Sequence, residues 1–222
     1  MKIYEVQDVI RENVGRDKIS ESQLNWCLSR GLRELEKHDN FYWMEASQLF
    51  QIEEDEQEYT LSQIQMENFK ESRSLMISDR TATDPRWVEV VGPKDIVDTM
   101  PNFTETDSAT PAFFTLQEEN DDPSILLWPP LPDQDYRAHW YYYKWTELPL
   151  DGRSNSHDVL RRWPEALIYL ATEQAILTAT KDAEQAMFWK SLFYNPNPAL
   201  STEYKRIKLF QDSRRSPKRA DS

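Results

Sequence analysis

The hydrophobic pattern changes twice along the chain, from helical spacing to strand-like runs and back again. Apolar residues recur every three or four positions over residues 2–14 and over residues 20–38, which predicts two amphipathic helices. Gly15 stands where the first helix should end, and Ser20 with Gln23 has the spacing of a capping box that begins the second. The N-terminal part of the chain is therefore expected to be helical.

The middle of the chain consists of short runs rich in β-branched and aromatic residues, which are typical of strands. These runs lie at residues 48–52, 58–61, 87–91, 111–117, 124–128 and 136–145. Residues 48–52 and 58–61 flank a short acidic connector, so they are interpreted as an antiparallel hairpin. The same interpretation applies to residues 124–128 and 136–145, which flank a proline-rich connection. Residues 66–83 fit no single pattern, although 74–78 is compatible with a strand.

Helical spacing returns after a polar loop at residues 147–157. Residues 158–180 and about 182–193 predict two further helices. Pro164 is tolerated there if it lies in the first turn of a helix that starts near Arg162 or Trp163. A last helix is expected at about 200–210, before the basic C-terminal residues.

This order of helices, strands and helices predicts an α+β fold with segregated layers. The N- and C-terminal helices, residues 1–44 and 157–210, are expected to pack into one helical bundle. Residues 45–156 would form an inserted, antiparallel β-rich domain, in which 93–100 reads as a helical turn or two. Residues 211–222 would form a basic, flexible and extended C-terminal tail.

Charge separates the body of the chain from its end. The 222 residues carry a formal net charge of −13, which argues against tight wrapping of nucleic acid but suits the wall of a passage through which DNA slides. Residues 201–222 are net positive, and this asymmetry predicts a docking tail. Cys27 is the only cysteine, so an internal disulfide is excluded, and we expect it to be buried. We see no secretory signal and no membrane-spanning run.

The sequence shows no catalytic constellation. The three histidines, His38, His139 and His157, are far apart and form none of the paired spacings of metal ligands. Glycine occurs only four times, so glycine-rich phosphate loops and a nucleophile elbow are absent. We therefore expect no enzymatic activity, no metal and no cofactor.

Aromatic residues crowd the last predicted strand, residues 136–145. Rings at consecutive positions from Trp140 to Tyr143 place aromatic side chains on both faces of a sheet. The favoured interpretation is structural, with one face in the core and the other against helices or a neighbouring subunit. The alternative is a carbohydrate-binding or hydrolytic protein that uses this strand as a sugar platform, which requires exposed and coplanar rings.

Several segments, in this order, resemble those of the head-to-tail adaptor (connector) proteins of tailed bacteriophages. They are RGLRELEKHDNFYWMEA (30–46), YTLS (59–62), TPAFFTL (110–116), ILLWPPLPDQDYRAHWYYYKW (125–145), ELPLDG (147–152) and WPEALIYLATEQA (163–175). The resemblance implies a structural virion protein, assembled in the host cytoplasm and located at the neck between capsid portal and tail. Such proteins form a twelve-fold ring that docks under the portal, extends and helps seal the DNA channel, and provides the platform for the tail.

The same resemblance implies partners and contact residues. The partners are other copies of the chain, the portal protein and tail or nozzle proteins, with transient passage of DNA and no sequence-specific nucleic-acid binding. The residues expected to dock on the portal are Tyr204, Arg206, Phe210, Arg214, Arg215, Lys218 and Arg219. Those expected at a subunit or tail interface are Trp128, Trp140, Tyr142 and Trp145. From about Tyr204 onward, the chain is expected to become ordered only on assembly.

Overall fold

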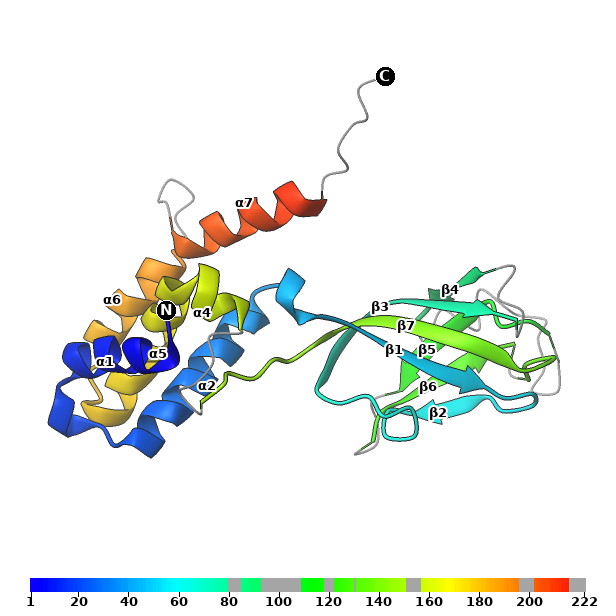
Figure 1. The fold of residues 1–222 in the computed structure, drawn as a ribbon, viewed down its shortest axis with the longest axis horizontal. Coiled ribbons are helices and arrows are strands. Elements are labelled where there is room, and N and C mark those ends of the chain that lie inside the picture. Colours follow the sequence, from blue (N-terminus) through cyan, green and yellow to red (C-terminus); the bar gives the residue numbers. More distant parts are fainter. Residues whose placement is uncertain are drawn as a thin grey trace, which may run out of the picture. The chain divides into compact units, whose positions relative to one another are not determined.

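The chain folds into two compact units, one helical and one β-rich (Figure 1). The computed structural model describes residues 1–79, 85–92, 109–117, 122–129, 131–150, 157–195 and 202–215. The helical unit consists of Met1–Trp43 and Thr146–Ser222, and the β-rich unit of Met44–Trp145. The β-rich unit is therefore an insertion between two halves of the helical unit.

The described α-helices all belong to the helical unit, and most of them match the helical spacing of the sequence. They are α1 (Ile3–Val14), α2 (Glu21–Lys37), α4 (Asp158–Arg162), α5 (Pro164–Ala179), α6 (Ala183–Phe193) and α7 (Glu203–Arg215), with short 3-10 turns η1 (Arg16–Lys18) and η2 (Tyr42–Met44). The predicted capping box begins α2: the Ser20 hydroxyl accepts from the Gln23 N–H, and the Gln23 side chain accepts from the Ser20 N–H.

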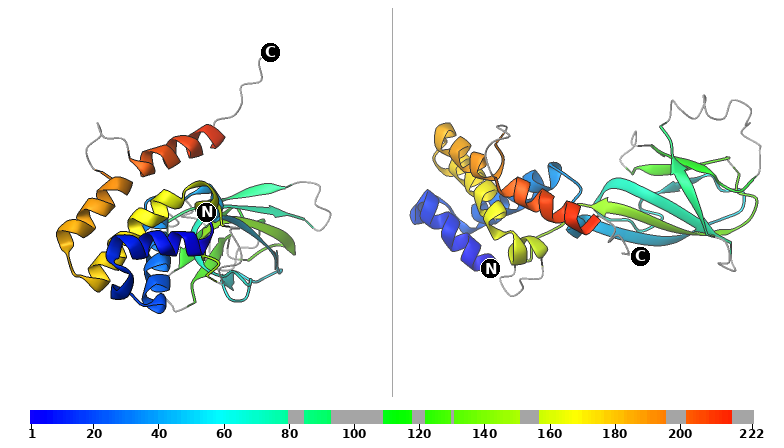
Figure 2. Two further views of the ribbon diagram at one scale, coloured as in Figure 1. Left: turned by 60° about the vertical axis from the view of Figure 1, so that its left-hand side comes forward. Right: turned by 90° about the horizontal axis from the view of Figure 1, so that it is seen from above.

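Helix α5 is the centre of the helical unit. It packs against α1, α2 and α6 and is buried on most sides, in keeping with its nearly continuous apolar sequence (Figure 2). Helices α2 and α5 approach closely at Gly31, where an added Cβ would lie 2.8 Å from the backbone nitrogen of Ala171. Cys27 is fully buried beside this contact, as expected.

The helix predicted over residues 158–180 is two helices. Trp163 separates α4 from α5 and has φ −134° and ψ 41°, outside the helical region. The break follows from Pro164, because the proline ring disfavours helical geometry in the residue before it. Pro164 itself occupies the first turn of α5, the position in which the sequence could accommodate it.

The β-rich unit is one curled sheet. Its strands are β1 (Glu45–Ile52), β2 (Glu58–Thr60), β3 (Phe69–Ser78), β4 (Arg86–Val90), β5 (Phe113–Gln117), β6 (Ser124–Trp128) and β7 (Tyr136–Lys144). They lie in the order β1-β7-β3-β4-β5-β6-β2. Strands from both edges line one core, because the rings of Phe50 in β1 and Tyr59 in β2 are 5.7 Å apart.

Both hairpin predictions are wrong. Strand β1 pairs with β7 and not with β2, while β2 pairs with β6. Strand β7 lies between β1 and β3, and β6 lies between β5 and β2, so β6 and β7 are not partners. The long strand β7 places Trp140 and Tyr142 in the core, and it needs a partner of comparable length along each edge. Strands β1 and β3 provide these partners, whereas β6 has only five residues.

The sheet is not purely antiparallel, since β4 and β5 form a short parallel pair through Glu89 with Phe113 and Val90 with Phe114. Within residues 66–83, which fit no single pattern in the sequence, residues 69–78 form one ten-residue strand. The helical turn predicted at 93–100 lies outside the described residues, and so do residues 216–222 of the predicted tail.

Candidate interaction surfaces

An outward-facing row of side chains crosses four strands of the β-rich unit. Leu49 in β1 is paired with His139 in β7, His139 with Met76 in β3, and Met76 with Trp87 in β4. We call these four residues the outer row. Their apolar neighbours Phe50, Ala138, Ile77 and Val88 point into the core, because side chains alternate between the two faces of a sheet.

The outer row is exposed at both ends. Leu49 is 68% exposed and Trp87 64% exposed, while Met76 and His139 are partly covered. Tyr141 extends the row: its ring lies 6.1 Å from Trp87, and its hydroxyl is 3.0 Å from Nδ1 of His139. Contiguous exposed apolar side chains of this kind are typical of protein-protein contact surfaces.

Two of the four interface residues predicted from the sequence, Trp140 and Tyr142, lie beneath this surface. Trp140 is fully buried, with its indole N–H donating to Ser72 Oγ at 2.9 Å, and Tyr142 is 6% exposed. Trp128 is partly buried at the end of β6, and Trp145 is covered by the ammonium group of Lys70, 4.9 Å from its ring. Within one chain, Trp140 and Tyr142 therefore support the sheet from inside.

The sugar platform is not supported by this arrangement. It requires exposed, coplanar rings along residues 140–145, whereas Trp140 and Tyr142 face the core. The partly exposed rings of Trp87 and Tyr141 are inclined to each other by 45°. The exposed position of Trp87 was not predicted from the sequence. Trp87 precedes Val88 in β4, and since Val88 is buried, the alternation of side chains along the strand places Trp87 on the outer face.

Acidic residues gather where β1 turns into β2. The turn carries Glu53, Glu54, Asp55 and Glu56, and the backbone N–H of Glu54 donates to Asp135 at 3.0 Å. The β-rich unit as a whole holds 21 acidic and 7 basic residues, whereas the helical unit holds 18 acidic and 19 basic residues. The net negative charge of the chain therefore resides in the β-rich unit.

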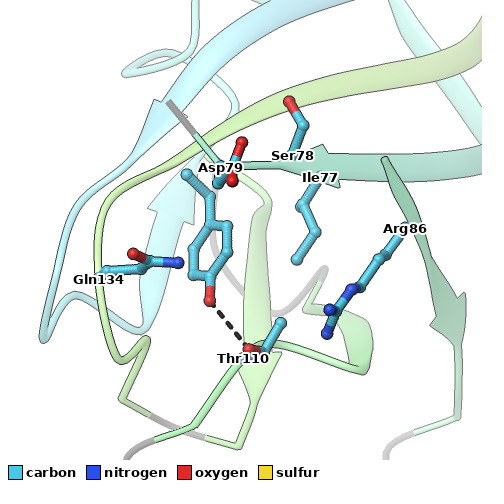
Figure 3. Close-up of a pocket in the computed structure, with 7 residues that line it drawn as sticks. Ile77, Ser78, Asp79, Arg86, Thr110 and Gln134 are labelled. Atoms are coloured by element: carbon cyan, nitrogen blue, oxygen red, sulfur yellow. Dashed lines mark hydrogen bonds between the residues drawn. The ribbon is translucent and has the colours of Figure 1, made fainter. Parts of the chain in front are cut away.

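A small polar cavity of about 140 Å³ opens near the end of β3 (Figure 3). Its wall includes Tyr136, whose hydroxyl is 2.9 Å from Thr110 Oγ1 and 2.5 Å from Asp133. Gln134 and Arg86 lie on opposite sides of Thr110. Burial and the hydrogen bond to Asp133 raise the pKa of the Tyr136 hydroxyl, so this group is a neutral hydrogen-bonding residue and not a reactive phenolate.

The helical unit contains one buried polar network. Glu36 in α2 is fully buried and accepts hydrogen bonds from the backbone N–H of Thr146, at 3.2 Å, and from the Thr146 hydroxyl. The same hydroxyl lies 2.7 Å from Nε2 of His157, whose Nδ1 accepts from the Val159 N–H at 3.1 Å. This arrangement fits a neutral imidazole that donates to Thr146 through Nε2.

Burial shifts both titratable groups of this network toward their neutral forms. Burial lowers the pKa of His157 to about 4, which keeps the imidazole neutral at physiological pH. Burial also raises the pKa of the Glu36 carboxyl, against the opposing effect of the hydrogen bonds from Thr146. The network joins the end of α2 to the start of α4, so its role is structural.

Helix α7 carries the first of the residues expected to dock on the portal. The Tyr204 ring packs against His38, Phe193 and Tyr194 at 5.6, 5.8 and 5.5 Å. The guanidinium of Arg206 pairs with Glu203 at 2.7 Å. Helix α7 also includes the backbone of two further basic residues, Arg214 and Arg215, whereas Lys218 and Arg219 lie outside the described residues.

The expectation that the chain becomes ordered only on assembly from Tyr204 onward is wrong for the first part of α7. Ile207 is fully buried and Gln211 is 1% exposed, so the helix packs on the helical unit through residue 211. Aromatic and amide contacts within one chain are sufficient to hold it. Basic residues predicted a flexible tail, but the apolar positions between them form the packed face of a helix.

No metal or membrane site emerges from the described residues. Across these parts of the chain, no three His, Cys, Asp or Glu side chains converge in a way that could hold a metal ion. Each helix in the same parts is too short or too polar to span a bilayer.

Comparison with known proteins places the chain in a family. Among curated proteins, no sequence matches it. The sequence model of the SU10 adaptor protein family, however, matches residues 1–220. This is a family of structural phage head-to-tail adaptors and not of enzymes. Because the match covers nearly every residue of both units, the chain belongs to the SU10 adaptor protein family.

Proposed function

We propose that this protein forms a ring under the portal of the filled capsid, extends and helps seal the DNA channel, and presents a platform for the tail. The observation that carries the proposal is the family match over residues 1–220, which includes both units. The ring would be twelve-fold and would lie at the neck of the virion.

The division of charge suggests which unit faces the DNA. The β-rich unit holds 21 acidic and only 7 basic residues, including the consecutive carboxylates of residues 53–56. Since DNA affinity comes from neutralising phosphates with lysine and arginine, a surface of this kind repels DNA and lets it slide. The β-rich unit is therefore proposed to line the DNA path.

The proposed contact surface of the β-rich unit is the outer row together with Tyr141. Its four residues carry no permanently charged group, in a unit that is otherwise strongly acidic. An uncharged surface lets two acidic bodies approach without bringing their carboxylates together. A neighbouring subunit or a tail component would cover Leu49 and Trp87. In this arrangement Trp140 and Tyr142 contribute indirectly, by fixing the sheet from its inner face.

Docking to the portal is proposed to use α7 and the basic residues that follow it. Residues 213–222 contain four basic residues and one acidic residue. A basic segment at the end of a nearly neutral helical unit is suited to an acidic groove of a partner. The proposed docking residues are those named from the sequence, with the last ones beyond residue 212 supplying most of the charge.

The test is binding of the full chain to purified portal rings. Deletion of residues 213–222 preserves the buried Gln211 and removes four of the basic residues. We expect binding to weaken at least tenfold and to lose part of its salt dependence, because rim charges act mainly through screened electrostatics. A second variant, which replaces residues 213–222 by a neutral serine-glycine segment of equal length, should weaken binding to the same extent, because it restores the length of the segment but not its charge. Unchanged binding after the deletion would contradict the docking role.

A further inference from the structure

Helix α7 contacts the stretch of chain that leads into the β-rich unit. Residues 39–43, which we call the first connector, join the end of α2 to Met44, the first residue of that unit. The ammonium group of Lys208 pairs with the Asp39 carboxylate, and Gln211 Nε2 donates to the Asn40 carbonyl at 2.9 Å. The Phe210 ring lies 5.8 Å from the Tyr42 ring. Three residues of a single helix therefore contact three residues of the first connector.

These contacts are partly protected from solvent. The Asp39 side chain is 17% exposed and that of Lys208 is 38% exposed, so their attraction is screened less than that of a fully exposed pair. The same pairing raises the pKa of the Lys208 ammonium group. Phe210 is further enclosed by Trp163 and by the Arg162 guanidinium, each 5.5 Å from its ring. The contact is thus a built interface and not a chance approach of surface residues.

The chain that returns from the β-rich unit is held differently. Residues 146–150, the second connector, begin with Thr146, which is bound by the buried Glu36 and by His157. Neither of these two partners belongs to α7. Removal of α7 would therefore affect the first connector directly and leave the second connector in place.

We infer that α7 acts as a brace: it stabilises the first connector and can be displaced from it. A partner that binds α7 then releases residues 39–42, while the Glu36–Thr146–His157 network continues to hold the second connector. Where that partner is the portal, the inference rests on the proposed function. The effect of binding at α7 is then transmitted to the chain that leads into the β-rich unit, through contacts within the helical unit alone. The partner must offer an acidic group for Lys208 and an apolar pocket for Phe210, since both side chains lose those contacts on release.

The first experiment needs no partner. Amide hydrogen exchange is measured on the full-length protein and on the Phe210→Ala/Gln211→Ala variant. We expect exchange in residues 39–44 to become about tenfold faster, since the protection of these amides follows the free energy of local opening. Exchange in residues 146–150 and in α2 should stay unchanged. Leu209→Ala is the matched control, because Leu209 lies between the two substituted positions and is 71% exposed.

Two results would overturn the brace. One is unchanged exchange at residues 39–44 in the double variant, and the other is an equal increase in α2, which would mean that the helical unit itself has been destabilised. Lys208→Ala provides a milder second variant, in which only the ion pair with Asp39 is lost. It should accelerate exchange at residues 39–41 by a smaller factor, and no acceleration in either variant would contradict the inference.

The second experiment adds purified portal rings to the wild-type protein. Exchange should slow in residues 203–215, as α7 is covered, and should accelerate about tenfold in residues 39–44. Binding that protects α7 but leaves residues 39–44 unchanged would contradict release. If the portal does not bind at all, release by the portal fails together with the proposed function, whereas the brace in the free protein is decided by the first experiment.

Discussion

The helical unit and the β-rich unit differ in the residues that form their cores and in their charge. The helical unit surrounds the apolar helix α5 with other helices and is nearly neutral, with 18 acidic and 19 basic residues. The β-rich unit builds its core on Trp140, Phe114 and smaller residues from every strand, and holds 21 acidic and 7 basic residues. The low isoelectric point of the chain is therefore a property of the insertion alone.

This difference in charge supports the two tasks proposed for the units. A nearly neutral unit with a basic end is suited to hold on to another protein, and an acidic unit is suited to stand beside DNA without binding it. Polar groups are placed accordingly. The helical unit buries Glu36 beside the partly buried His157 where the insertion returns, whereas most of the acidic residues described in the β-rich unit lie outside its strands.

The largest difference in stability between the two units is expected when a substitution disrupts the core of only one of them. Trp140→Ala is expected to destabilise the β-rich unit by about 3–5 kcal/mol, because it leaves a cavity under the sheet. The near-ultraviolet circular dichroism of that unit should be lost, while the helical signal at 222 nm persists. Tyr141→Ala is the control, since the next residue along β7 points outward. Loss of both signals at one denaturant concentration would show that the units fold as one.

The second largest effect is expected from pH and should be confined to the helical unit. His157 is neutral in the fold, with a pKa of about 4, and its ordinary pKa is 6.5. The unfolded chain therefore binds the extra proton first as the pH falls, and stability decreases between about pH 6.5 and 4. From pH 7 to pH 5 we expect a loss of about 2 kcal/mol in the free energy of unfolding.

The control for this pH effect is His157→Asn, which retains a capping side chain for α4 and cannot titrate. Glu36 acts in the opposite direction, because its raised pKa favours the folded state as the pH falls. Since the variant keeps Glu36, the difference between wild type and variant isolates the imidazole. Equal loss of helical signal in both proteins from pH 7 to pH 5 would rule out His157 as the cause.

The smallest effect on stability is expected at the outer row. Leu49→Ala with Trp87→Ala should change the free energy of unfolding by less than about 0.5 kcal/mol, because both side chains are largely exposed. Assembly on portal rings should nevertheless weaken at least tenfold, as for truncation of aromatic anchors at an interface. Met187→Ala is the matched control, an equally exposed apolar residue of α6 in the helical unit, outside the proposed docking helix. Assembly at wild-type strength, measured by mass, would contradict the proposed interface.

The helices were predictable because their signals are local. The capping box at Ser20, the apolar spacing of α2 and Pro164 at the start of α5 all lie within a few residues of the structure they specify. The tail was the exception. Its charge suggested disorder, but Ile207 and Gln211 face the helical unit, and only the packed structure shows that surface.

Strand positions were largely predictable, but strand partners were not. The pairings of β1 with β7 and of β2 with β6 join residues that lie more than sixty positions apart. The outward face was also hidden in the sequence. Leu49 and Phe50 are adjacent and both apolar, so the phase of β1 is undefined until a partner fixes it.

By itself, the sequence determined the order of elements, the ends of its capped helices, the resemblance to phage adaptors and the charge of each segment. These are local or additive properties of the chain. The tertiary structure alone decided that Trp140 and Tyr142 are core residues, that Leu49 and Trp87 form the exposed row, and that α7 contacts the first connector. Each of these depends on which distant segment covers a given face, because burial is a property of the packed pair of surfaces and not of either segment alone.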